Sequence, residues 1–342
     1  MAAVVSLVLS VTAACGVGGG GEGKDSLVFV SYGKGAYQDG QQQAWLKPFE
    51  ARTGTKIVID GPSDNAKLKA MVKSGKVTWD VMDTDAFTAR ENCGTLFEKI
   101  DMGELANDFP PGTLSECGVP DAMFGLILMY NEKTYGDHPP TRLADFFDAK
   151  AFPGKRLIYS GDPGVGTLEA GLLADGVAPK DLYPLDVHRA LGVYDRIKPD
   201  LTLAQTYGQQ QQSMVGNQAD MALVVSARAY SALAAGGTSW KPVWDRVPVT
   251  WDVLTIPKGS PHKKRAQELI KFASQPKQSA KFAALAGAGP ANTAAKPALN
   301  KLQRQVDVFG EAHKNTRVVI DGQWWTENRA TVVNAWTKWM TG

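Results

Sequence analysis

The stretch SLVFVSYGKGAYQDGQQQAWLKPFEARTGTKIVIDG, residues 26–61, predicts the kind of fold that this chain adopts. Its first seven residues form a short apolar run that ends in glycines, which is typical of a buried strand. The segment after it has a helical pattern that Gly54 stops, and residues 55–61 resume as a second strand. A strand, a helix and a strand in this order predict a βαβ unit within a mostly parallel sheet.

The same alternation continues along the chain. Residues 67–74 predict a helix and residues 77–87 a third strand, while apolar runs at 125–135 and 249–257 predict two strands that cross between lobes. The 342 residues are too many for one ordinary core and suit two lobes. Ligands of such sheets bind beyond the carboxyl ends of the strands, so we expect site residues at those ends.

Composition and motifs argue against several classes of function. The chain has 37 basic and 35 acidic side chains, and its net charge of +2 gives no electrostatic reason to bind nucleic acid. No GxSxG, HExxH, Walker or GxGxxG motif stands in a fitting context, so the sequence predicts neither an enzyme nor a cofactor. The four histidines are scattered, and no cysteine–histidine cluster has the spacing of a metal site.

The first residues, MAAVVSLVLSVTAAC, are typical of the apolar part of a signal peptide and too short to serve as a membrane span. We expect cleavage before Cys15, a lipid on its thiol, and a glycine-rich tether, so that residues 1–24 lie outside both lobes. The segment lacks a basic start, and Thr12 stands where such sites usually have leucine. The alternatives are a buried N-terminal strand and a disordered tail.

Cys93 and Cys117 are the other two cysteines of the chain. In an exported protein an isolated pair of this kind predicts a disulfide. Closing a loop of about 24 residues would stabilise the fold by roughly 3 kcal/mol in the chain-entropy account. Two buried free thiols are the alternative.

Polar and aromatic side chains follow several of the predicted strands. Ser31, Tyr32 and Tyr37 lie among glycines that let a ligand approach the backbone, unless this segment is a plain turn. Thr84 follows the third strand between two aspartates, either of which could cap the next helix. These positions are candidates for ligand contacts.

Further along, SGDPGVGT at 160–167 opens a predicted helix, and its free backbone N–H groups favour an anion. A tight turn capped by Asp162 is the alternative for this loop. Arg228 stands where the apolar run of ALVVSARAY (222–230) leaves the sheet, and Asp252 is the single carboxylate of VTWDVLTIP (249–257). A guanidinium and a carboxylate at strand ends indicate a charged ligand.

Six segments together resemble a known family. They are FVSYGKGAYQDGQQQAW, KLKAMVKSGKVTWDVMD, LMYN, GQQQQSMVGNQADMALVVSARAY, TWDVLTIPKGSPHKKRAQELIKF and DGQWWTENRATVVNAWTKW. In this order they are similar to the spermidine/putrescine-type solute-binding proteins of ABC importers, in the branch that binds γ-aminobutyrate and polyamines. The resemblance runs from about residue 26 to 342.

The resemblance implies the type II periplasmic-binding-protein fold: two α/β lobes, mostly parallel sheets with flanking helices, and a hinge of two strands. Lobe one would comprise 25–127 plus 253–296, and lobe two 128–252 plus 297–342, with the last segment packed back across it. The chain would be a monomer outside the cytoplasm, anchored to the membrane through Cys15. It would do no chemistry, close around a small solute and deliver it to ABC permease subunits.

Family members that bind polyamines use carboxylates for the ammonium ends and aromatic rings along the methylenes. Carried over by position, Ser31, Tyr32, Thr84, Trp251 and Asp252 match places that contact ligand. The chain departs from the family at Arg228, where diamine binders have an acid, and at GVG (164–166), where they have a glutamate.

This departure favours a ligand with a carboxylate at one end and an ammonium at the other. A diammonium ligand would place a cation against Arg228, at a cost of about 4 kcal/mol for 4 Å and an effective dielectric constant of 20. We expect Arg228 to bind the carboxylate, helped by the N–H groups of the loop Gly164, Val165, Gly166 and Thr167.

At the other end of the ligand, Asp252 would bind the ammonium, with Trp251, Tyr32 or Tyr37 over the apolar middle. An ω-amino acid such as γ-aminobutyrate is therefore the favoured solute.

Several alternatives stay open. Arg228 could instead pair with Asp220, Asp252 or Asp195, in which case a polyamine returns as the ligand. A secreted thiaminase-like enzyme would need a free cleft cysteine, and a ferric-ion receptor would need adjacent cleft tyrosines. Near the end of the chain, Asp321, Trp324 and Trp325 either reach the cleft or clasp the lobes, and we favour the clasp.

Overall fold

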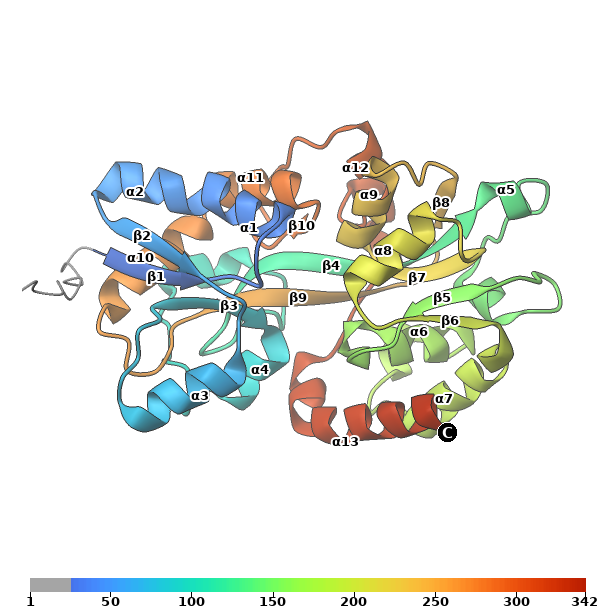
Figure 1. Ribbon diagram of the computed structural model, residues 1–342, viewed down its shortest axis with the longest axis horizontal. Helices are drawn as coiled ribbons and strands as arrows, with labels where there is room; N and C mark the ends of the chain where they lie inside the picture. The colour runs from blue at the N-terminus through green and yellow to red at the C-terminus, as the bar shows by residue number, and fades with distance from the viewer. Residues whose placement is uncertain (1–25) are drawn as a thin grey trace, which may run out of the picture.

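The computed structural model describes residues 26–342, which form two lobes joined by two long strands (Figure 1). The central sheet runs in the order β2-β1-β3-β9-β4-β7-β5-β6. Lobe one contributes the parallel strands β1 (Ser26–Val30), β2 (Lys56–Asp60) and β3 (Val81–Asp85). Lobe two contributes the parallel strands β5 (Arg156–Tyr159), β6 (Leu201–Ala204) and β7 (Met221–Val225). The predicted two-lobed α/β fold is confirmed.

Strands β4 (Val119–Asn131) and β9 (Val247–Thr255) form the connection between the lobes. The first half of β4 pairs antiparallel with β9, and from Leu126 onward it pairs instead with β7 of lobe two. Likewise β9 pairs with β3 of lobe one only over residues 252–255. The predicted lobe boundaries at 127/128 and 252/253 fall inside these two strands and stay a prediction.

Helices cover both faces of each half of the sheet (Figure 1). Lobe one carries α1 (Ala36–Gln41), α2 (Lys47–Thr53), α3 (Asn65–Ser74), α4 (Ala86–Glu91), α10 (Lys263–Ala273) and α11 (Pro276–Ala286). Lobe two carries α5 (Glu132–Tyr135), α6 (Thr167–Ala174), α7 (Val187–Asp195), α8 (Tyr207–Val215) and α9 (Ser226–Ala234). The remaining elements are α12 (Lys301–Gln305), α13 (Gly322–Thr341), and the short strands β8 (Trp240–Val243), β10 (Gly289–Pro290) and β11 (Arg317–Val319).

The first βαβ unit shows why these residues form these elements. The predicted helix after β1 is continuous from α1 through a π-helical stretch, Gln42–Leu46, into α2. Gly54 ends it with a φ of 74°, a left-handed conformation that glycine adopts without a Cβ penalty. Burial of Trp45, Leu46 and Phe49 fixes this helix against the sheet.

Lobe one also contains the predicted disulfide, between Cys93 and Cys117. Cys117 is fully buried and packs with Phe97 and Trp79 in a small secondary core. The disulfide prediction is confirmed.

Helix α13 runs along lobe two and begins beside α4 of lobe one (Figure 1). Trp325 stacks on Phe87 of α4 at 5.7 Å between ring centroids, and its Nε1 donates to Glu169 of α6 at 2.6 Å. The adjacent Trp324 packs on Tyr183 of lobe two, while Asp321 caps the helix by accepting from its first N–H groups. This segment therefore contacts both lobes, and its interpretation as a clasp between them is confirmed. Within residues 26–342, no helix has the length and apolarity needed to cross a membrane.

Candidate functional site

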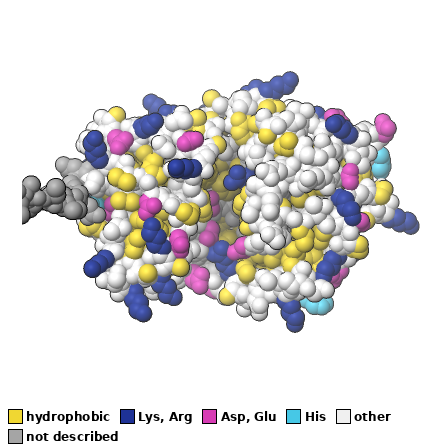
Figure 2. All heavy atoms as spheres, in the orientation of Figure 1, with side chains coloured by type: hydrophobic (Ala, Val, Ile, Leu, Met, Phe, Trp, Pro, Cys, Tyr) yellow, Lys and Arg dark blue, Asp and Glu magenta, His cyan; other side chains and the backbone are white. Residues whose placement is uncertain are grey.

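The surface is hollowed between the lobes, and acidic and basic side chains both lie along the hollow (Figure 2). Strand ends from both lobes meet there. Strands β3 and β9 contribute residues on the lobe-one side, and on the lobe-two side β7 leads into α9. This is the position that the sequence predicts for a ligand.

On the lobe-one side, Asp83, Asp121 and Asp252 form a group that we call the acidic cluster. They come from β3, β4 and β9, three adjacent strands. Asp252 pairs with Asp85, two residues after Asp83, so Asp83 and Asp252 face the same side of the sheet. A bulge in β4 between Pro120 and Ala122 takes Asp121 out of the regular ladder.

The hydroxyls of two tyrosines reach this cluster. Tyr32 donates to Asp252 Oδ1 at 3.2 Å, and Tyr37 donates to Asp121 Oδ2 at 3.4 Å. The two rings meet edge to face at 6.1 Å between centroids. Both tyrosines therefore lie where the sequence predicts them, as does Asp252.

Ser31 supports the cluster instead of facing the gap. Its hydroxyl is fully buried and donates to Gln41 Oε1 at 2.6 Å, while the Gln41 amide donates to Asp83 Oδ2. The structure thus gives Ser31 an indirect role in place of the predicted ligand contact. Gln41 was missed by the sequence analysis, where it appeared as one polar residue of a helical segment.

Electrostatics of the acidic cluster favour a bound cation. Burial and the neighbouring carboxylates raise the pKa values of Asp83 and Asp252 well above the usual range. Burial raises the pKa of Asp121 to about 7. None of the three forms an ion pair with a Lys or Arg of the described chain. A bound cation would lower these pKa values, because a nearby positive charge stabilises the carboxylate forms.

Two residues predicted to contact the ligand lie on the face of the sheet that points away from the gap between the lobes. Trp251 is 1% exposed, donates from Nε1 to the Thr113 carbonyl at 3.0 Å and meets Phe87 at 6.3 Å. Thr84 pairs with Val253, so the alternation of β3 turns it away from Asp83. These two predictions are wrong because successive strand residues face opposite sides, and Trp251 belongs to the core under α13.

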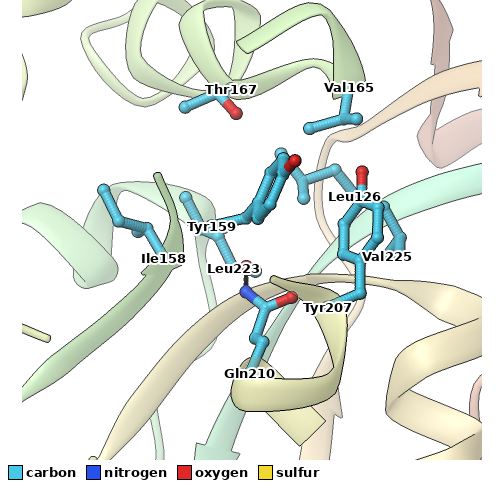
Figure 3. A pocket seen from close by; sticks show the side chains of 9 residues that line it. All are labelled: Leu126, Ile158, Tyr159, Val165, Thr167, Tyr207, Gln210, Leu223 and Val225. Atoms are coloured by element: carbon cyan, nitrogen blue, oxygen red, sulfur yellow. Dashed lines mark hydrogen bonds between the residues drawn. The ribbon is translucent and has the colours of Figure 1, made fainter. Parts of the chain in front are cut away.

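On the lobe-two side, two tyrosines line a small cavity (Figure 3). The rings of Tyr159 and Tyr207 stack at 4.4 Å between centroids. Val165, from the loop before α6, and Thr167, the first residue of α6, line the same cavity. Neither tyrosine was predicted. Tyr159 ends the apolar run of β5, which is the kind of signal that selected Tyr32, whereas Tyr207 lies three residues past β6 and begins α8.

The loop at 162–167 differs from its predicted role as a set of free donors. The Gly164 N–H donates to Asp162 Oδ1 at 2.8 Å, and the Gly166 N–H donates to the Pro163 carbonyl at 3.2 Å. Asp162 therefore caps this turn, as the alternative stated. A Cβ at Gly166, whose φ is 98°, would lie 2.5 Å from Pro248, so glycine is required for the loop to approach β9.

Arg228 lies in the first turn of α9, directly after β7 ends. Its guanidinium is 5.6 Å from the centroid of the Tyr207 ring, and it makes no ion pair with any acid among residues 26–342. The proposed internal partners all bond elsewhere: Asp220 to Thr134 and Lys155, Asp195 to Trp339, and Asp252 to Tyr32. The structure thus contradicts the alternative of a structural ion pair.

Tyr207 connects the two charged sides of the gap. Burial raises the pKa of its hydroxyl, Tyr159 and Asp252 add to this effect, and the positive charge of Arg228 opposes it. Asp252 of lobe one and Arg228 of lobe two therefore both act on one ring. Opposite charges thus come from the two lobes toward the same ring.

A second arginine, missed from the sequence, joins the lobes beside this site. Arg329 of α13 binds Asp85 Oδ1 of lobe one at 2.9 Å and Asp162 Oδ2 of lobe two at 2.7 Å. It also donates to the Thr88 hydroxyl at 2.9 Å. No sequence pattern links residues this far apart.

Metal binding has no support in the described residues, which contain no group of three His, Cys, Asp or Glu side chains able to hold a metal ion. The disulfide leaves Cys93 and Cys117 without free thiols, so neither supplies the nucleophile that a thiaminase-like enzyme would need.

Residues 44–327 match the family described as bacterial extracellular solute-binding protein. The chain belongs to this family. It is 31% identical to a γ-aminobutyric acid-binding protein of Pseudomonas aeruginosa over 323 residues, which cover 92% of this chain and 90% of that protein. The predicted resemblance to solute-binding proteins of ABC importers is thus confirmed.

Solved structures of solute-binding proteins are similar over nearly the whole length. A structure described as the Atu4243-GABA receptor is 30% identical, with a TM-score of 0.83 and coverage of 92% of this chain and 97% of that one. The protein AgtB of Agrobacterium tumefaciens, solved with agropinic acid, is 32% identical, with a TM-score of 0.76 and coverage of 93% and 99%. A substrate-binding protein from Bradyrhizobium japonicum is 30% identical, with a TM-score of 0.83 and coverage of 92% and 99%.

The solute-binding protein described here thus serves an ABC importer outside the cytoplasm, where it binds a small molecule and delivers it to the permease. The relatives that it matches are solute-binding proteins and not enzymes.

Proposed function

We propose that this solute-binding protein captures an ω-amino acid such as γ-aminobutyrate in the gap between its lobes. The observation that carries the proposal is the unpaired guanidinium of Arg228 on lobe two, opposite the acidic cluster of lobe one. The ligand carboxylate accepts from Arg228, since a guanidinium fork matches a carboxylate in bidentate fashion. The ligand ammonium binds Asp252.

Aromatic rings from both lobes cover the methylenes of this ligand. Tyr32 and Tyr37 stand on one side and Tyr159 and Tyr207 on the other, and their faces also attract an ammonium group. The names of two relatives, a γ-aminobutyric acid-binding protein and a GABA receptor, support the same ligand class.

A polyamine is the second candidate, and the acidic cluster is the observation that favours it. Arg228 disfavours a polyamine, because a diamine would place its second ammonium near an unpaired guanidinium. At 4 Å and an effective dielectric constant of 20 this repulsion is about 4 kcal/mol. The balance favours a dipolar ligand over a dication.

Lobe closure is part of the proposed mechanism. A ligand held by Asp252 of lobe one and Arg228 of lobe two has both contacts only when the lobes approach, so it stabilises the closed form. The permease then distinguishes the loaded receptor by its closed shape. Arg329 and Trp325, which already bind both lobes, would set how readily closure occurs.

Attachment to the membrane rests on Cys15, which lies outside the described residues, as do the signal peptide and the tether. We expect a lipid on this thiol and a monomeric receptor at the outer face of the membrane. Mass spectrometry of the expressed N-terminus, and release of a Cys15→Ser variant from membranes, test this part of the proposal.

Isothermal titration calorimetry decides the ligand class. The purified chain without its first 24 residues is titrated with γ-aminobutyrate, putrescine, spermidine and agropinic acid. We expect saturable binding of γ-aminobutyrate and at least tenfold weaker binding of putrescine. Tight binding of putrescine without binding of any ω-amino acid would overturn the proposal.

A further inference from the structure

We propose that Asp83 and Asp121 extend the Asp252 site into a three-carboxylate subsite that selects a primary ammonium group through its three N–H donors. The inference rests on the proposed function, because it concerns the end of the ligand that Asp252 binds. It adds the chemical class of amine that the receptor accepts.

One hydroxyl, that of Tyr37, affects the pKa values of all three carboxylates. Tyr37 donates to Asp121 Oδ2 at 3.4 Å, and hydrogen bonding by the same hydroxyl opposes the raised pKa values of Asp83 and Asp252. A tyrosine hydroxyl has one proton and can satisfy only one acceptor at a time. The cluster therefore has more acceptors than donors.

Two oxygens of the cluster show this deficit directly. Asp83 Oδ1 and Asp121 Oδ1 are buried and have no hydrogen-bond partner, on side chains that are 0% and 5% exposed. Buried carboxylate oxygens are almost always paired in folded proteins, because an unpaired one loses its hydration without compensation. These two atoms indicate donors that arrive with a ligand.

The donors must also bring positive charge. The titratable groups that face the cluster are Tyr32 from the loop after β1, Tyr37 of α1, Asp85 of β3 and Tyr207 of α8. The uncharged Gln41 is already engaged with Asp83. Arg329, which joins the lobes beside the site, binds Asp85 and Asp162 and no member of the cluster.

Strand order explains how one small group can meet all three acids. Asp252 lies on β9, and β3 with Asp83 and β4 with Asp121 flank β9 on its two sides. Asp83 pairs with Leu254, and Asp121 directly precedes Ala122, which pairs with Asp252, so each flanking strand places an acid within two residues of the Asp252 position. Because a primary ammonium has three N–H donors and a trimethylammonium has none, only the former can pair with these oxygens.

The test is a methylation series measured by titration calorimetry. Wild-type protein is titrated with 4-aminobutyrate and with its N-methyl, N,N-dimethyl and N,N,N-trimethyl derivatives, all of which keep the positive charge. We expect each methyl group to weaken binding by about tenfold, in line with the loss of one hydrogen bond to a charged group. Equal affinity for the four compounds would overturn the inference.

Isosteric variants test whether the selectivity for a primary ammonium comes from the two buried acids, Asp83 and Asp121. Asp121→Asn and Asp83→Asn each remove a charge without changing shape, and Glu104→Gln alters an exposed carboxylate of lobe one as the control. We expect either cluster variant to bind 4-aminobutyrate at least tenfold more weakly. We also expect the affinity for the primary amine, divided by that for the trimethylated compound, to be smaller than in wild type. A purely structural defect would leave this affinity ratio unchanged.

Failure of this inference differs from failure of the proposed function. If wild-type protein binds no ω-amino acid but binds putrescine, the same series is run with N-methylated putrescines, and an equal response again contradicts the subsite. If 4-aminobutyrate binds and Asp121→Asn and Asp83→Asn keep the wild-type ratio, the subsite is wrong while the function stands.

Discussion

Replacement of Arg228 by glutamine tests the dipolar site most directly. The guanidinium has no acid partner within residues 26–342, so its loss leaves no stranded charge in the empty protein. In the complex with γ-aminobutyrate it removes one side of a charged, bidentate pair. Removing one partner of a buried charge pair costs about 2–5 kcal/mol, and the half-buried position of Arg228 favours the lower end. A loss of about 2–3 kcal/mol is roughly a 30- to 150-fold weaker Kd.

The same substitution has the opposite effect on a diamine. Relief of the repulsion at 4 Å, about 4 kcal/mol at an effective dielectric constant of 20 and less in salt, should tighten putrescine binding by at least tenfold. Opposite shifts for the two ligands cannot come from a folding defect, which weakens both. Arg228→Lys should fall between wild type and Arg228→Gln, because it keeps the charge and loses the fork.

Calorimetry at 0.15 M salt measures both ligands on each variant. Arg246→Gln serves as the matched control, since Arg246 is another half-buried arginine of lobe two that donates to the Val177 carbonyl. A Kd for γ-aminobutyrate within about threefold of wild type in Arg228→Gln, well below the shift expected for a lost charge pair, would refute the reasoning.

Three further predictions concern closure, pH and stability. Arg329→Met should weaken ligand binding about tenfold and raise the radius of gyration of the saturated protein in X-ray scattering, whereas Lys338→Met on the same helix should change neither; unchanged values would contradict a clasp. Because burial raises the folded-state pKa of Asp121 to about 7, its protonated form stabilises the empty fold at low pH. That contribution should be lost as pH rises from about 4 to about 7, by up to about 1.4 kcal/mol per pH unit. Urea unfolding should show this slope reduced in Asp121→Asn, and an identical slope would refute it. The double variant Cys93→Ser/Cys117→Ser should lower the free energy of unfolding by about 3 kcal/mol for the 24-residue separation, and a loss below about 1 kcal/mol would contradict the chain-entropy account.

Much of the candidate site could be predicted because it depends on local signals. Tyr32, Arg228 and Asp252 stand where apolar runs end or carry a single charge, and the strand ends of an α/β sheet meet at one edge. Thr84 and Trp251 were placed wrongly, because a strand reverses its face at every residue and an error of one position is enough to move a side chain into the core.

Asp121 shows a second limit. It is a lone carboxylate within a buried strand, and that signal could have selected it, but only the pairing of β4 with β9 brings it beside Asp252, 131 positions away. The contacts of Arg329 with Asp85 and Asp162 are equally remote from any local pattern.

The sequence by itself determined the alternation of strands and helices, the division into two lobes and the cysteine pair, because hydrophobic period and turn chemistry act over a few residues. Only the tertiary structure decided that Tyr37 reaches Asp121, that Arg228 has no acid partner among residues 26–342 and that Arg329 joins the lobes. Those outcomes depend on strand register and on contacts between residues far apart in the chain, and no short-range rule specifies either.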